Sequence, residues 1–158
     1  MKGTLLVKNV KHLVTCDADD RLLDGVNVFI RDGVIESIGQ NEETAADVID
    51  ASNMVMYPGL INTHHHLYQT FSRNLPQVQN MELFPWLKTL YEIWKHVDED
   101  VVYYSSLTGM GELLKTGCTT CLDHHYVFPG TVGGGLLDAQ FHACLLYTSD
   151  AADDSLRV

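Results

Sequence analysis

The sequence has no apolar run long enough to cross a membrane, and its N-terminal stretch MKGTLLVKNVKHLV is interrupted by Lys8 and Lys11. Such an interruption is unlike the continuous apolar core of a secretory signal. Positive charge is also scarce, with 10 Lys and Arg against 21 Asp and Glu and a net charge of -11. A surface of this sign would repel phosphate backbones and anionic lipids. We therefore expect neither a nucleic acid nor a membrane as partner.

Cysteine is rare as well, with four residues, Cys16, Cys118, Cys121 and Cys144. Without a secretory signal, four cysteines favour free thiols in a reducing compartment, so we expect a cytoplasmic protein. Cys118 and Cys121 are spaced as a Cys-x-x-Cys motif, which can bind metal or act in redox chemistry. On a strand, however, residues three apart point to opposite faces, and this favours structural thiols.

The first part of the chain, residues 1–57, has the pattern of a small β-module. Short apolar runs alternate with Asp-Gly pairs at residues 24–25 and 32–33, and an Asp-Gly pair between such runs predicts a hairpin turn. The runs are LLVKNV, HLVTC, VNVFIRDGVIESIG and VIDASNMVMY. At Pro58-Gly59 the pattern changes, so we place a domain boundary near Tyr57.

Residues 58–144 read as strand, helix and strand. The run LINTHHH predicts a strand, and helical spacing predicts a helix from Asp98, its N-cap, to Lys115, with Gly117 as C-cap. The segments CTTCLDHHYV and AQFHAC predict further strands, and the glycine-rich stretch 130–135 predicts a flexible connection. This order is typical of the β-α-β unit of a parallel sheet or barrel.

The most informative residues are His64 and His66. Residues two apart on a strand share a face, so both imidazoles can reach one metal ion while His65 points away. Neutral imidazole is a common zinc ligand. Histidines at a strand end can equally serve as hydrogen-bonded polar groups, and the spacing alone leaves both interpretations open.

The segment PGLINTHHHLYQT, following a β-rich module, resembles the first barrel strand of the amidohydrolase superfamily. The resemblance implies an α/β fold, namely a truncated metal-dependent (β/α)8 TIM barrel preceded by a small N-terminal β-sandwich module. It makes His64 and His66 ligands of one divalent metal, zinc. It also places two further His, an Asp and the general acid Glu outside this chain, so we expect no catalytic residue in it and no activity from it alone.

A narrower resemblance rests on HHHLYQT, LFPWLKTLYEIW and TGCTTCLDHHYVFP, which are similar to the 8-oxoguanine deaminase group. It implies hydrolytic deamination of a small heterocycle, 8-oxoguanine to urate and ammonia, by an enzyme that we expect to be a homo-oligomer at full length. It also implies substrate-binding roles for Gln69, for Trp86 in a loop covering the substrate, and for His124 and His125. For Gln69 a local hydrogen bond, and for Trp86 loop packing, would explain the residue equally well.

Two other functions stay open: another aminohydrolase of the same superfamily, acting on an s-triazine, guanine or a pterin, and a non-catalytic fragment that holds a histidine cluster. The final residues, 145–158, are open to two interpretations as well. They could form a short helix capped by Ser149. The string LLYTSDAADDSLRV also resembles a translated sequencing adapter, and we therefore expect a non-native tail.

Overall fold

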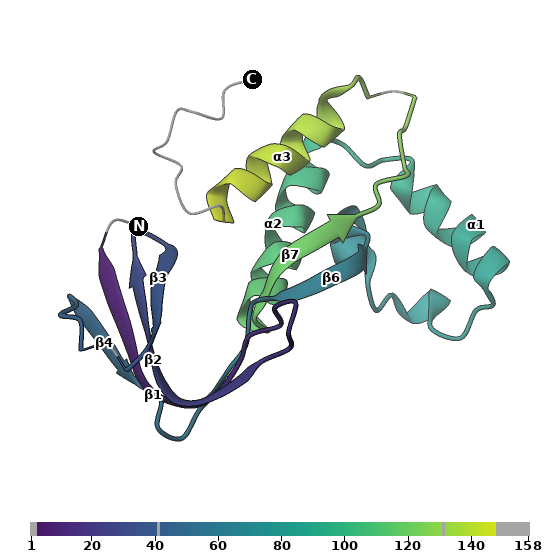
Figure 1. The fold of residues 1–158 in the computed structure, drawn as a ribbon. Coiled ribbons are helices and arrows are strands. Elements are labelled where there is room, and N and C mark those ends of the chain that lie inside the picture. The colour runs from purple at the N-terminus through teal and green to yellow at the C-terminus, as the bar shows by residue number, and fades with distance from the viewer. Residues whose placement is uncertain (1–2, 41, 131, 148–158) are drawn as a thin grey trace. The chain divides into compact units, whose positions relative to one another are not determined.

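The computed structural model describes residues 3–40, 42–130 and 132–147 (Figure 1). The chain forms two compact units, Met1–Leu60 and Ile61–Val158. The division falls a few residues after the boundary predicted at Tyr57. None of the helices in the described part of the chain is long and apolar enough to cross a membrane. All four cysteines are free thiols.

The first unit is built on one twisted sheet with the strand order β3-β2-β1-β4, in which β5 also pairs with β1. Its strands are β1 (Thr4–Val14), β2 (Leu22–Arg31), β3 (Val34–Gly39), β4 (Asp47–Asp50) and β5 (Val55–Met56). β2 is antiparallel to β1 and β3, whereas β4 and β5 run parallel to β1. Within residues 3–40 and 42–60 these strands form a single sheet, so the second sheet of the predicted β-sandwich is not found there.

One of the two predicted hairpin turns is confirmed. The Asp-Gly pair at residues 32–33 joins β2 to β3, and Gly33 has a φ of 83°, a value that a residue without a Cβ adopts easily. The backbone N–H of Gly3 donates to Asp32 Oδ1 over 2.8 Å, which ties the start of β1 to this turn.

The hairpin predicted at residues 24–25 is wrong, because that pair lies inside β2, where Asp24 pairs with His12. The turn from β1 to β2 is instead organised by Asp17. Its carboxylate accepts the backbone N–H of Asp19 at 3.1 Å and the Arg21 guanidinium at 2.7 Å. This guanidinium lowers the pKa of Asp17 to about 2. An ion pair with two local backbone bonds can fix a turn without an Asp-Gly sequence.

The strand β6 (Leu60–His65) starts at the boundary residue and belongs otherwise to the second unit, which contains one further described strand, β7 (Cys118–Asp123). A backbone bond of 2.9 Å from His124 N–H to His65 O joins the carboxyl ends of the two strands, so they run in the same direction. The helices are η1 (Leu67–Ser72), η2 (Pro76–Val78), α1 (Leu83–Trp94), α2 (Glu99–Lys115) and α3 (Gly135–Tyr147). The predicted β-α-β order is confirmed. The described residues do not form a closed barrel.

Helix α2 has the predicted ends. The Asp98 side chain accepts the backbone N–H of Val101 at 2.8 Å, and Gly117 has a φ of 83° just beyond the last turn. These are the N-cap and C-terminal features that the sequence indicated. The residues that α2 buries are mostly small, namely Val102, Ser105, Ser106 and Gly109. This surface allows η1 to lie close against the helix.

The strand predicted at AQFHAC is wrong, because these residues belong to helix α3. Leu136 and Ala143, seven residues apart, are both buried, and Ala139 between them packs on the core of the unit. This is helical spacing. The predicted glycine-rich connection does link β7 to α3. Of the tail predicted to be non-native, residues 145–147 continue α3, and residues 148–158 lie outside the described part of the chain.

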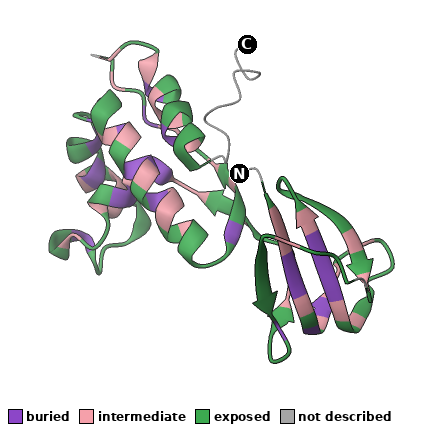
Figure 2. Cartoon of the chain, turned by 90° about the vertical axis from the view of Figure 1, so that its left-hand side faces the viewer, coloured by how far each residue is buried: buried purple, intermediate pink, exposed green. Residues whose placement is uncertain are grey.

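Each unit has its own apolar core (Figure 2). In the first unit the core lies on β1, on β2 and at the residue directly after β4, and it comprises Val7, Val10, Leu13, Val28 and Ala51. In the second unit the core combines two aromatic with six aliphatic side chains and comprises Tyr68, Val78, Leu90, Trp94, Val97, Val102, Val127 and Leu136. The core of the second unit therefore joins η1 and α1 to the end of β7, where the histidines lie.

Replacing Gly109 by alanine is expected to destabilise the second unit. A Cβ at this position would lie 2.9 Å from both Leu67 Cδ2 and Thr70 Oγ1, and both side chains are buried. Overpacking of this kind costs about 1–3 kcal/mol, which outweighs the gain of about 1 kcal/mol in helix propensity. Urea denaturation followed by circular dichroism measures the difference.

Gly111→Ala is the matched control for this prediction, because Gly111 lies in the same helix. Its added Cβ would meet the Tyr147 hydroxyl at 2.7 Å, and a hydroxyl at the end of a flexible side chain can move away. We expect Gly111→Ala to be neutral or to stabilise the unit by up to about 1 kcal/mol. Equal stability of the two variants would contradict the close approach of η1 to α2.

Candidate functional site

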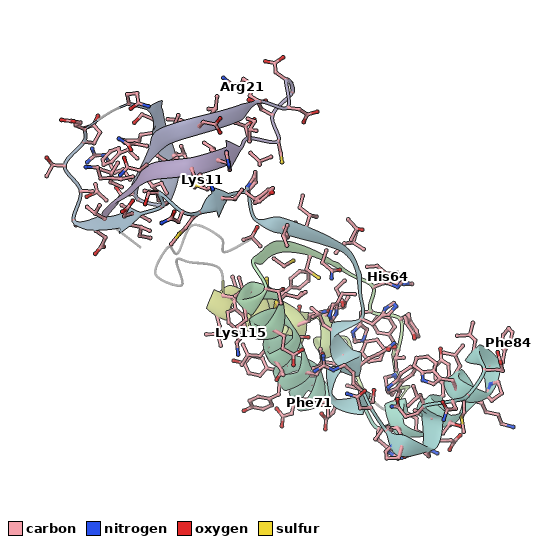
Figure 3. The ribbon with its side chains drawn as sticks, turned by 90° about the horizontal axis from the view of Figure 1, so that it is seen from below. Lys11, Arg21, His64, Phe71, Phe84 and Lys115 are labelled. Atoms are coloured by element: carbon pink, nitrogen blue, oxygen red, sulfur yellow. The ribbon has the colours of Figure 1, made fainter. Side chains whose placement is uncertain are left out.

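The carboxyl end of β6 brings two imidazole rings together. His64 Nε2 and His66 Nε2 lie 3.2 Å apart, and the two rings meet edge to face with centroids 5.0 Å apart. Figure 3 labels His64 at this strand end. The alternation of a strand places both rings on one side, as the sequence spacing predicted. The two nitrogens therefore converge on one point.

The ring of His66 is fixed from behind by the neighbouring strand. Its Nδ1 lies 2.8 Å from the backbone oxygen of His124, an atom that can only accept a hydrogen bond. Nδ1 therefore carries the proton, and the lone pair of Nε2 is left for a ligand. A backbone carbonyl behind a histidine is a common partner for a metal-binding imidazole, because it sets both the tautomer and the ring orientation.

The donor set fits a zinc ion. Two nitrogens bound to one tetrahedral zinc at about 2.05 Å would lie about 3.3 Å apart, which agrees with the separation at His64 and His66. Within residues 3–40, 42–130 and 132–147, no group of three or more His, Cys, Asp or Glu side chains is placed to hold a metal ion. The pair can thus supply two ligands of a site that needs at least one more protein ligand.

His65 turns away from this pair toward α2. A Cβ at Gly109 would lie 3.6 Å from His65 Cε1, which places the ring over that helix. Its Nδ1 is buried without a hydrogen-bond partner. Burial lowers the pKa of His65, which favours the neutral ring. The middle histidine of the three is therefore a packing residue in this structure.

The histidine pair opens into a hollow of about 450 Å³ whose lining residues lie at the end of β6, in η1 and at the two residues that flank η1: His64, His65, His66, Gln69, Thr70 and Arg73. Gln69 and Arg73 also line a neighbouring hollow of about 510 Å³, which Trp86 borders.

Trp86 lies in the first turn of α1, whereas a covering loop was predicted. Its ring packs edge to face on Trp94 with centroids 5.6 Å apart. The predicted ring contact of Trp86 stays a prediction.

The side chain of Gln69 is held by two tyrosines. Its Nε2 donates to the Tyr126 hydroxyl at 2.8 Å and to the Tyr68 hydroxyl at 3.0 Å. Both N–H groups of the amide are thereby used, and Oε1 remains as an acceptor. Burial raises the pKa of Tyr68 well above its ordinary value, so this hydroxyl stays protonated. The local hydrogen bond considered for Gln69 from the sequence therefore exists and leaves half of the amide available.

Arg73 brings little free positive charge to the hollow, because Glu112 of α2 neutralises it. The guanidinium donates two parallel bonds of 2.7 and 2.9 Å to the Glu112 carboxylate. This pairing raises the pKa of Arg73 and lowers the pKa of Glu112. The side chains that line the hollow are thus polar, and the positive charge of Arg73 is largely cancelled by Glu112.

His124 and His125 are not among the residues that line the hollow beside His64, although the His124 ring lies next to the His66 ring with centroids 5.5 Å apart. Both line a separate cavity of about 510 Å³ between β7, α2 and α3. His125 Nε2 lies 2.8 Å from the oxygen of Val127, and its ring packs on Tyr68 with centroids 4.8 Å apart. His124 contributes its backbone oxygen to His66. Substrate contacts of these two side chains stay predictions.

Sequence reasoning missed two residues that surround the histidine pair. Tyr126 holds Gln69 and meets the His66 ring edge to face, with centroids 5.1 Å apart. Asp123 accepts the backbone N–H of Leu67, the residue directly after His66. A signal was available for both: they come within a few residues of the end of a strand predicted to be parallel to the histidine strand.

Comparison with known proteins identifies similar chains. The profile of the amidohydrolase family matches residues 55–145. A hydroxydechloroatrazine ethylaminohydrolase from Pseudomonas sp. (strain ADP) is 38% identical over 156 residues, which covers 90% of this chain and 32% of that protein. An 8-oxoguanine deaminase from Pseudomonas aeruginosa is 46% identical over 107 residues, which covers 65% of this chain and 24% of that protein.

Among solved structures, the atrazine chlorohydrolase from Arthrobacter aurescens TC1, complexed with zinc, superimposes with a TM-score of 0.81 at 27% sequence identity. The match covers 89% of this chain and 33% of that one. The chain thus spans about a third or less of the length of these relatives. Its mixed α/β architecture matches the N-terminal third of amidohydrolase structures.

Proposed function

Because the chain belongs to the amidohydrolase family, we propose that it carries two zinc ligands and part of the substrate site of an aminohydrolase. Its relatives are named as deaminases and aminohydrolases, enzymes that hydrolyse C–N bonds. In the proposal, β6 and β7 are neighbouring strands of a (β/α)8 barrel. Barrel enzymes carry their active sites at the carboxyl ends of the strands, and the histidine pair lies at such an end.

The observation that carries the proposal is the convergence of His64 Nε2 and His66 Nε2 at 3.2 Å, with His66 held by a backbone oxygen. Zinc, when bound, would lower the pKa of water, so that hydroxide able to attack a ring carbon would be available near neutral pH. The contribution of this chain is to hold the two imidazoles in the orientation that binds the ion. The further ligands and the general acid come from outside the described residues.

The proposed substrate is a purine-like ring, and 8-oxoguanine, which would yield urate and ammonia, is the first candidate. The 46% identity to an 8-oxoguanine deaminase supports it. The orientation of Gln69 supports the same class of ring, because Oε1 is left to accept an N–H from the substrate. Lactam rings such as 8-oxoguanine present N–H groups along their edges. Gln69 lines the same hollow as the histidine pair, so it can reach a ring bound beside the metal site.

An s-triazine is the second candidate substrate. The hydroxydechloroatrazine ethylaminohydrolase aligns with 90% of this chain, a larger share than the 65% aligned with the 8-oxoguanine deaminase. The atrazine chlorohydrolase also superimposes well. These likenesses extend through the first unit and the histidine strand, so they support the shared chemistry more strongly than a particular ring.

A pair of chimeras tests the choice of substrate. The segment of this chain that aligns with each relative replaces the corresponding segment of the 8-oxoguanine deaminase and of the hydroxydechloroatrazine ethylaminohydrolase. We expect the first chimera to release ammonia from 8-oxoguanine faster than from guanine, isoxanthopterin or hydroxyatrazine. We expect the second to lose most of its turnover of its own triazine, because Gln69 and its neighbours would favour a purine edge.

The 158-residue chain alone is the control, and we expect no ammonia release from it even with added zinc, since two histidines do not complete a catalytic zinc site. Retention of triazine turnover together with loss of 8-oxoguanine turnover would favour the second candidate. Two folded, zinc-loaded chimeras without any aminohydrolase activity would contradict the proposed function itself.

A further inference from the structure

Asp123 connects three elements around the histidine pair. Its Oδ1 accepts the backbone N–H of Leu67 at 2.6 Å, and its Oδ2 accepts from Gln140 Nε2 at 2.7 Å. Asp123 is the last residue of β7, Leu67 is the first of η1, and Gln140 lies on α3. Both oxygens of one half-buried carboxylate are thus used to hold other parts of the fold.

The hydrogen bond to Leu67 lies where the backbone passes from the histidines at the end of β6 into η1. His66 is the N-cap of η1 but offers no side-chain bond to the first turn. Asp123, from another strand, supplies that acceptor instead. A carboxylate at the start of a helical turn accepts a backbone N–H that would otherwise lack a partner. Its negative charge also interacts favourably with the partial positive charge at that end of the turn.

The same strand end holds the ring of His66. His124 follows Asp123 directly, its N–H donates to His65 O at 2.9 Å, and its oxygen lies 2.8 Å from His66 Nδ1. The Asp123 bond, the strand bond and the imidazole bond therefore form one continuous group of contacts. Loss of the first would allow the backbone after His66 to shift, and the imidazole would then lose its alignment with the carbonyl.

We propose that Asp123 is a positioning residue that sets the zinc affinity of the His64–His66 pair. It does so by fixing the backbone next to His66 and next to His124, the two residues whose hydrogen bond orients the His66 ring. This inference rests on the proposed metal site. Groups behind a metal-binding histidine commonly change metal affinity by about 10- to 100-fold. Because Asp123 acts through the backbone next to His66, we expect the lower end of that range.

The test is calorimetric titration of zinc chloride into the 158-residue chain and its variants at pH 7. Asp123→Ala should weaken zinc binding by about 10-fold. Asp123→Asn should stay close to wild type, since its Oδ1 still accepts from Leu67 and the Gln140 amide can rotate to accept from the new N–H. In ¹⁵N spectra, Asp123→Ala should also lower the population of the His66 tautomer that carries its proton on Nδ1, and Asp123→Asn should preserve that population.

Asp98→Ala is the matched control, because Asp98 is also a carboxylate that accepts a backbone N–H at a helix start, remote from the histidines in sequence. It should leave zinc affinity unchanged. An equal loss of affinity in Asp98→Ala and Asp123→Ala would overturn the proposal, as would wild-type affinity in a folded Asp123→Ala. If Asp123→Ala does not fold, Asp123→Leu replaces it, because leucine has a similarly branched side chain but offers no acceptor to the backbone N–H of Leu67. Unchanged affinity in that variant would likewise overturn the proposal.

The failure of the metal site itself has a different signature. If His66→Ala takes up zinc as well as the wild type, the histidine pair is not the zinc site, and the proposed function fails. If His66→Ala loses zinc while a folded Asp123→Ala keeps it, the metal site stands and the positioning role of Asp123 fails.

Discussion

Alanine in place of His64 or His66 is expected to abolish zinc-dependent turnover, whereas alanine in place of His65 should spare most of it. The first two residues supply the converging nitrogens, 3.2 Å apart, and the third packs over α2. Loss of a partner behind a zinc ligand already costs about 10- to 100-fold, so loss of a ligand itself should cost more than about 100-fold. The ammonia-releasing chimera with the 8-oxoguanine deaminase is the protein in which this can be measured.

The matched set is three single variants in one background, assayed for ammonia release and for bound zinc. His65→Ala should keep its zinc and lose stability, because it leaves a cavity beside Gly109. Equal losses of activity and zinc in all three variants would show that the alternation of β6 does not separate ligands from packing residues.

Trp94→Ala is expected to be the most destabilising single change in the second unit. Trp94 is 1% exposed, and its ring lies edge to face with Tyr68 and Tyr91 at centroid distances of 5.4 and 5.5 Å. Its Nε1 also donates to Ser72 Oγ at 3.0 Å. Truncation of a buried tryptophan costs about 3–5 kcal/mol, which is a large part of the stability of a typical domain. The shift in the urea midpoint, followed by far-ultraviolet circular dichroism because this signal does not rely on the removed tryptophan, measures the loss of stability.

Phe84→Ala is the control for that experiment. It removes an aromatic ring from the same helix, but Phe84 is 79% exposed and is labelled at the outer end of α1 in Figure 3. Its effect should stay within about 0.5 kcal/mol. A similar destabilisation by both variants would contradict a core centred on Trp94.

Much of the fold was accessible from local chemistry. Asp98 at a helix start and the Asp-Gly pair at residues 32–33 each fix the backbone through their own side chain or conformational freedom, so the sequence predicts them. AQFHAC failed because a short apolar run fits a strand and a buried helix equally well. The pair at residues 24–25 failed because the Asp17–Arg21 ion pair makes the turn earlier in the chain.

For the candidate site, the sequence predicted the part that depends on one strand. His64 lies on β6 and His66 follows it directly, so the extended backbone of this one segment is enough to bring the two rings together. The residues that hold them come from far along the chain: Asp123 bonds to a residue 56 positions away, and Tyr126 to one 57 positions away. Such contacts depend on the pairing of β6 with β7 at one register, and no local pattern encodes that register.

The central claim is that His64 and His66 bind one zinc ion through their Nε2 atoms, and long-range ¹H–¹⁵N spectra of the histidine-labelled chain test it most directly. The chain has 8 histidines, so each ring can be assigned by substitution. On addition of zinc, the Nε2 signals of His64 and His66 should shift together, and His66 Nδ1 should stay protonated. A shift confined to His65 or His124, or unchanged signals of the pair at saturating zinc, would contradict the account.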